Sequence, residues 1–153
     1  MSLEEDIKFM MEDIKHRVGK TSEAMVQTLA KEAFDESTRM FGTYDHEGDW
    51  PGLAERTLVT HRQKQDLIAA AGFPGVDTPL VVSGELKESV GMSVTGDSAS
   101  VGTNNILMTY HELGAGHVPP RPVFGPTANF VASKMDEILG PVLIKVMGEE
   151  HGD

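Results

Sequence analysis

The sequence predicts an α+β fold in a single domain that spans residues 1–153. Apolar side chains recur at helical spacing near the start, alternate with small polar residues in the middle, and return to helical spacing near the end. An order along the chain of helices, then a small antiparallel sheet, then a helix is typical of this class. The C-terminal helix is expected to pack on the sheet. Residues 1–20 are expected to form an N-terminal helical extension, residues 21–147 the core, and residues 148–153 a tail.

Two amphipathic helices are predicted at the N-terminus. Ser2 and Glu5 have the spacing of a capping box, in which each side chain bonds a free backbone N–H group of the first turn. Gly19 favours an end to this helix, and a second helix is expected over residues 21–41. The alternative is one long helix bent at Gly19. The first apolar stripe consists of Leu3, Ile7, Met10, Met11, Ile14 and Val18.

A β-hairpin is predicted in the middle of the chain. Residues 90–94 alternate apolar and polar side chains, which is the pattern of a strand with one buried face. Gly96 and Asp97 are a signal for a two-residue turn with glycine first, and residues 99–103 are expected to be the return strand. The buried face should carry Val90, Met92 and Val94. We expect it to be covered by a stripe of the second helix, namely Val26, Leu29, Ala33 and Phe34.

The remaining segments carry weaker signals. Residues 42–51 are predicted to be a polar loop, residues 54–71 a helix with a poor apolar pattern, and residues 104–113 a short helix. The prolines between residues 119 and 122 force an extended path. Pro141 is expected to kink or split the C-terminal helix, because it removes one helical hydrogen bond. The stripe of that helix consists of Val131, Met135, Ile138, Leu139, Val142 and Val146.

Composition and charge exclude several kinds of partner. The formal net charge is −11, and acidic residues are spread along the chain, so nucleic-acid backbone and anionic lipid should repel it. We therefore expect no specific nucleic-acid binding and no membrane partner. The absence of cysteine removes disulfides and thiolate metal sites, and the acidic start lacks the basic region of a signal peptide. Both features fit synthesis in a reducing cytoplasm.

One segment superficially resembles a zinc peptidase motif. Such a motif needs two histidines four residues apart on one helical face, with a glutamate between them as the base. Here Ala115 occupies the second-ligand position, and His111 and His117 are six residues apart with two glycines between them. A serine-nucleophile pattern and a phosphate-binding loop are also absent from the sequence. We therefore expect no enzymatic activity, no catalytic residues, no metal and no cofactor; a small metallohydrolase that uses His111 and His117 is the remote alternative.

Five short sequence pieces stand in order from Trp50 onward. They are Trp50-Pro51-Gly52-Leu53 with Thr57; Leu80, Ser83-Gly84, Leu86 and Ser89-Val90; Val101-Gly102-Thr103; Tyr110-His111-Glu112-Leu113-Gly114; and Val118-Pro119-Pro120-Arg121-Pro122-Val123-Phe124-Gly125-Pro126. With these pieces the chain resembles the tail-completion or neck proteins of tailed bacteriophages, the head–tail joining and virion-morphogenesis group. It departs from the family pattern at Ser83, where threonine is usual, and at Val123-Phe124, where Phe-Leu is usual. The first helix and residues 62–78 match nothing in the family.

The resemblance implies a structural virion protein at the head–tail junction, made in the cytoplasm of the bacterial host. Its partners would be copies of itself in a ring, a head-completion or adaptor protein on one side, and a tail tube or tail terminator protein on the other. The alternatives are a tail terminator, a minor capsid protein or a transient assembly chaperone.

Four residues are expected at contacts between copies: Trp50, Gly96, Arg121 and Phe124. Large aromatic side chains and arginine are enriched at interfaces, and all four residues lie in loop-like segments. The alternative for Trp50 and Phe124 is that they cap the core, and for Arg121 that it pairs with a local acid. Tyr110 and Leu113 lie three residues apart, so one helical face is expected to bury both.

Overall fold

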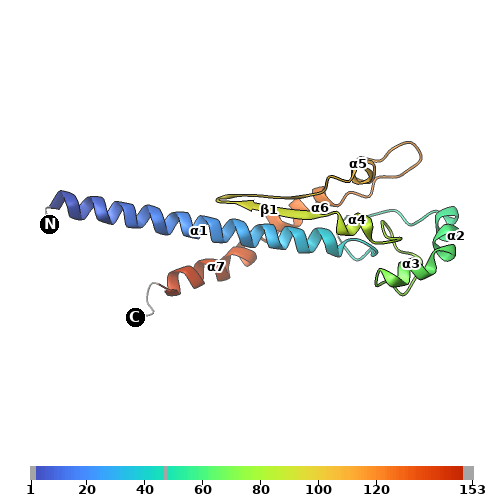
Figure 1. The fold of residues 1–153 in the computed structure, drawn as a ribbon, viewed down its shortest axis with the longest axis horizontal. Helices are drawn as coiled ribbons and strands as arrows, with labels where there is room; N and C mark the ends of the chain where they lie inside the picture. Colours follow the sequence, from blue (N-terminus) through green and yellow to red (C-terminus); the bar gives the residue numbers. More distant parts are fainter. Residues whose placement is uncertain (1–2, 47, 150–153) are drawn as a thin grey trace.

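The computed structural model describes residues 3–46 and 48–149, and the chain has an α+β fold, as predicted (Figure 1). Helices combine with a two-stranded antiparallel sheet, and the C-terminal helices pack on the sheet. The elements in chain order are α1 (Leu3–Arg39), α2 (Glu55–Gln63), α3 (Gln65–Ala70), α4 (Glu85–Glu88), β1 (Gly91–Thr95), β2 (Ser98–Gly102), α5 (Ile106–Leu113), α6 (Phe124–Ser133) and α7 (Met135–Glu149).

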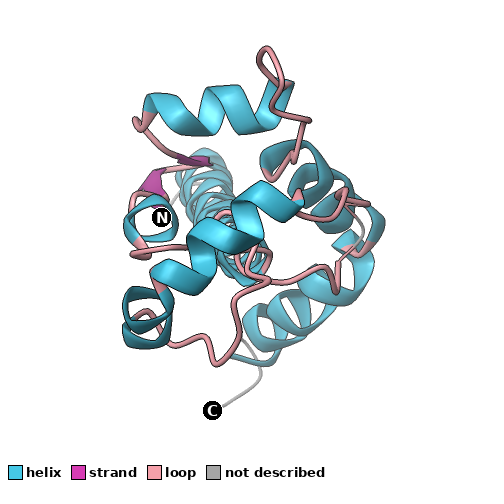
Figure 2. Cartoon of the chain, turned by 90° about the vertical axis from the view of Figure 1, so that its right-hand side faces the viewer, coloured by secondary structure: helices cyan, strands magenta, loops and turns pink. Residues whose placement is uncertain are grey.

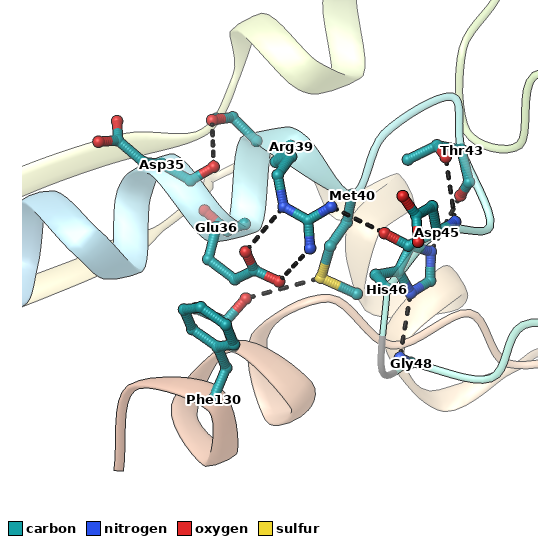
Figure 3. Close-up of polar contacts among 12 residues, drawn as sticks. Asp35, Glu36, Arg39, Met40, Thr43, Asp45, His46, Gly48 and Phe130 are labelled. Carbon is teal, nitrogen blue, oxygen red and sulfur yellow. Dashed lines mark hydrogen bonds and ion pairs between the residues drawn. The ribbon is translucent and has the colours of Figure 1, made fainter. Parts of the chain in front are cut away.

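The N-terminal segment forms one helix, α1, of 37 residues. Of the two predicted arrangements, the single long helix is therefore the one observed, and it passes through Gly19 without an end. Its last turn is fixed by Arg39, which donates two hydrogen bonds to the Glu36 carboxylate and a third, of 2.7 Å, to the carbonyl oxygen of Asp45 (Figure 3). The C-terminal end of α1 is thereby tied to the loop that follows it.

The hydrophobic core lies at the C-terminal end of α1 rather than under the sheet. Viewed from that end, the shorter helices surround the axis of α1 (Figure 2). Segments from much of the chain contribute side chains to this core, because α2 to α6 all lie around the C-terminal half of α1 (Figure 1). The buried cluster consists of Met40, Phe41, Trp50, Val81, Val90, Met108 and Val123.

The hairpin forms with the predicted two-residue turn. Thr95 pairs with Ser98, and Gly96 in the turn has a φ of 58°, a left-handed conformation that glycine adopts at low cost. The predicted buried face is only partly correct. Val90 is buried but precedes β1, while Met92 is 44% exposed.

Two predicted helices are divided at a single residue. The expected helix over residues 54–71 is divided at Lys64, which separates α2 from α3. The C-terminal stripe is divided at Lys134, whereas α7 continues through Pro141, where a kink or a split was expected, so the split does not occur there. A proline inside a helix removes one hydrogen bond, and the rest of the helix retains its ladder. Within the described part of the chain, no helix is both long and apolar enough to cross a membrane.

Candidate assembly site

The first and last of the five sequence pieces meet at one hydrogen-bonded junction. The Trp50 indole Nε1 donates to the carbonyl oxygen of Pro122 at 2.8 Å. The Arg121 guanidinium donates through Nε and Nη2 to the carbonyl oxygen of Pro51, at 3.2 and 3.0 Å. Nη2 also donates to the carbonyl oxygen of Gly52 at 3.0 Å. Side chains from each piece thus hold the backbone of the other, across 69 to 72 residues of chain.

The fourth piece joins the same junction through Glu112. Its carboxylate accepts hydrogen bonds from three consecutive backbone N–H groups at the start of α6, at 2.7 Å from Val123, 3.2 Å from Phe124 and 2.9 Å from Gly125. The first N–H groups of a helix have no partner within the helix, and the helix dipole favours negative charge there. Glu112 therefore caps α6 and fixes its direction relative to α5.

The second and third pieces are linked by a hydroxyl pair. Ser89 Oγ lies 2.7 Å from Thr103 Oγ1, so the segment before β1 is joined to the residue after β2. Thr103 Oγ1 also accepts from the backbone N–H of Asn105, and the Asn105 side chain in turn caps α5 by accepting from the N–H of Leu107. The hairpin is thereby connected to α5, which carries Glu112.

The structure places Trp50 and Arg121 inside the subunit. Trp50 is 7% exposed and belongs to the core, where its ring meets that of His46 edge to face at 4.1 Å. Arg121 is 6% exposed, and its backbone N–H donates to the carbonyl oxygen of His111 at 2.6 Å. These placements argue against both as direct contacts between copies, because their side chains have almost no free surface. The expected pairing of Arg121 with a local acid is also not what is observed, since its side chain donates to the carbonyl oxygens of Pro51 and Gly52.

A cavity of about 540 Å³ lies beside this junction, and three histidines line it. His61 Nδ1 lies 2.8 Å from the carbonyl oxygen of Val76. His111 Nδ1 is buried and has no hydrogen-bond partner among the described residues. Burial, and then the charge of Arg121, lower the pKa of His111 below its ordinary value of 6.5. In the described ranges, no group of three or more histidine, aspartate or glutamate side chains is placed to hold a metal ion.

An open apolar groove of about 460 Å³ lies between α1, β2 and α6. Phe124, which is half-buried, lines it, and so does Asp97, which follows Gly96 in the hairpin turn. Of the described residues that line the groove, Asp97 alone is charged. The groove is thus bordered by Phe124, an expected contact residue, and by Asp97, the neighbour of the expected contact residue Gly96. Its other lining residues are Val26, Leu29, Ala30, Ala33, Ala99, Ser100, Val101, Thr127, Ala128, Val131, Ala132 and Met135.

Two exposed apolar surfaces were not predicted from the sequence. The first is on α1, where Ile7, Met10, Met11 and Val18 are between 45% and 63% exposed. The second is on α5, where Tyr110 and Leu113 are 47% and 75% exposed, which corrects the expectation that one helical face buries both. The periodicity of the sequence does show both stripes. It does not show whether a stripe is covered by the same chain.

Comparison with known proteins adds no relative. No protein-family model, curated protein or solved structure matches the chain.

Proposed function

We propose that this chain is a structural subunit of the neck of a tailed bacteriophage or prophage-like particle. In this proposal it is a tail-completion or head–tail joining protein, has no enzymatic activity, and forms a closed ring of identical copies. Its neighbours in the particle are a head-completion or adaptor protein on the head side, and a tail tube or tail terminator protein on the tail side.

The observation that carries the proposal is the convergence of the family-like pieces. Trp50, Glu112 and Arg121 come from three of the five pieces, and each holds backbone atoms of another piece. Residues that resemble a family in sequence and also build one junction are the residues expected to preserve a fold. This supports a shared scaffold, and the role in the neck is proposed from it.

Charge supports the same proposal. A joining protein surrounds the path of the DNA that leaves the head, and a chain with a formal net charge of −11 repels phosphate rather than binding it. A ring also needs a contact that joins two different surfaces of neighbouring copies and closes after a full rotation. The apolar stripe of α1 and the groove beside α6 are two such different surfaces.

Deletion of the gene from the genome that encodes the chain tests the proposal. We expect full heads and finished tails that remain separate, with joining restored by the gene supplied in trans. Mass spectrometry of purified particles should then find the chain, and averaged images of the head–tail junction should contain a ring of it. A chain absent from finished particles would be an assembly chaperone instead. A chain located on the capsid shell, or a ring at the level of the tail terminator, would contradict the proposed position.

A further inference from the structure

We propose that the first part of α1 of one copy docks in the groove between α1, β2 and α6 of the next copy. We call residues 7–20 of α1 the arm. This inference rests on the proposed ring and names the contact that closes it. In Figure 1 the start of α1 extends past both the hairpin and the end of α7. Arg17 and Lys20, at the end of the arm, line a pocket together with residues of α7.

The apolar side chains of the arm have the arrangement that helix-in-groove recognition uses. Ile7, Met10 and Met11 stand at i, i+3 and i+4, and Val18 continues the same face two turns later. They are 45%, 54%, 52% and 63% exposed, respectively. Phe9, which is 72% exposed, lies on the opposite face and serves as an internal control.

The lining of the groove is chemically suited to an apolar helix face. Five of its lining residues are alanines, namely Ala30, Ala33, Ala99, Ala128 and Ala132. Such small side chains let the backbone of a second helix approach closely, while Val131, Met135 and Phe124 supply a larger apolar surface.

Two lysines of the arm suit the acidic border of the groove. Residues 3–20 of α1 hold four basic and five acidic residues, and three of the acidic residues, Glu4, Glu5 and Asp6, precede the arm. Lys8 and Lys15 are seven residues apart, so they lie on one side of the helix beside the apolar stripe. The charged residue that lines the groove is Asp97. Each copy therefore presents a helix whose apolar face is flanked by two lysines, and an apolar groove with an acidic border.

The geometry of α1 keeps the arm out of the groove of its own chain. Val26, Leu29 and Ala33 of α1 form one wall of the groove, and the arm belongs to the same unbroken helix. A continuous helix cannot fold back onto its own wall, so the arm reaches only the groove of a neighbour. The contact joins two different surfaces and is therefore head-to-tail, which is the kind that closes into rings.

The size of the contact fits assembly on a template. At 1.5 Å per residue the arm is about 20 Å long. If one face of a helix of this length is covered, the contact buries on the order of a few hundred Å² on each side. A stable pair of proteins usually buries about 800 Å² on each side. One arm is therefore a weak contact for two free copies, and closure of a ring adds the contacts together.

Disulfide trapping tests the inference, because the natural chain has no cysteine. One chain carries Met11→Cys and a second carries Ala128→Cys. Mixed at the highest soluble concentration and oxidised, they should give a mixed dimer, while each alone gives little. In the control pair, Phe9→Cys replaces Met11→Cys, and the yield should fall at least several-fold. Asp97→Lys in the groove chain should also lower the yield, and Lys8→Glu with Lys15→Glu in the arm chain should restore it.

Three outcomes overturn the inference. One is dimers of Met11→Cys chains alone at the yield of the mixed pair, which would mean that arms pair with arms. Another is a Phe9→Cys pair that reacts as well as the Met11→Cys pair. The third is no mixed dimer at all. Failure of the proposed function looks different: the mixed dimer forms with the pure chains, but the chain is absent from the neck of particles. Particles can also be assembled from a chain that carries both Met11→Cys and Ala128→Cys. If they contain the ring but no crosslink forms between copies, the arm contact is rejected and the ring is retained.

Discussion

The two ends of α1 differ in what surrounds them, although their sequences carry the same kind of apolar stripe. At the C-terminal end, Ala30 and Ser37 are buried, and the helix leads into the core residues Met40 and Phe41. Toward the N-terminal end, Val18 is 63% exposed. Helical periodicity predicts which face is apolar, but it does not distinguish a face buried in the same chain from one left for a partner. The difference separates the part of α1 that stabilises the subunit from the part that we assign to assembly.

Phenylalanines near the two ends provide the largest test of this difference. Phe41→Ala should lower the free energy of unfolding by about 3–5 kcal/mol, because it empties a fully buried site. Phe9→Ala removes the same side chain from an exposed position and should change that free energy by no more than about 0.5 kcal/mol. Urea denaturation followed by circular dichroism measures both. Equal effects would mean that the arm packs on its own subunit.

Arg121 should give the next largest effect. Arg121→Lys loses the fork of donors that reaches two carbonyl oxygens, and a lysine cannot replace it. We expect a loss of about 1.5–3 kcal/mol in the free energy of unfolding, the range for hydrogen bonds to charged groups. Arg17→Lys, in the arm, is the matched control, because its side chain is about half exposed. If Arg121→Lys lowers the free energy of unfolding no more than Arg17→Lys does, the hydrogen bonds of Arg121 contribute little to stability.

Much of the local structure could be predicted from the sequence, because it depends on neighbouring residues. The Gly96-Asp97 turn and the end of α5 at Gly114 follow from backbone chemistry that is visible in a few letters. The hydrogen bonds of Trp50 and Arg121 could not be predicted, since their acceptors lie about seventy residues away along the chain. The break at Lys134 instead of Pro141 is marked by no glycine or proline at that position. The groove forms only where α1, β2 and α6 come together in the fold, so no sequence pattern indicates it.

A glycine in the arm region allows a smaller test. Gly19 is exposed, and a Cβ atom added there would meet no atom within 4 Å. Gly19→Ala should favour the helix by about 0.5–1 kcal/mol, because alanine loses less backbone entropy than glycine. The gain should appear as slower amide hydrogen exchange in the arm. Gly96→Ala is the contrasting substitution, and it should destabilise the hairpin because φ is 58° there.

The pH dependence of stability should show the smallest effect. The pKa of His111 is lowered in the folded chain by burial and by the charge of Arg121, so the unfolded chain takes up a proton more readily. This contribution to stability is complete above pH 6.5 and is lost as the pH falls from 6.5 toward the lowered pKa. The urea midpoint of the wild type should therefore fall more steeply from about pH 7 to pH 5 than that of His111→Gln. His16→Gln, at an exposed position of the arm, controls for the loss of one histidine.

The spacing of the hydrogen bonds along the chain has a consequence for the order of folding. Glu112 holds amides only 11 to 13 residues away, so α5 and α6 can associate early at a small cost in loop-closure entropy. The bonds of Trp50 and Arg121 close loops of 69 to 72 residues, and contacts between such distant residues form late. Arg121→Lys should therefore act mainly by accelerating unfolding, with little change in the folding rate. The junction that joins the sequence pieces thus determines how long the subunit stays folded once it has formed.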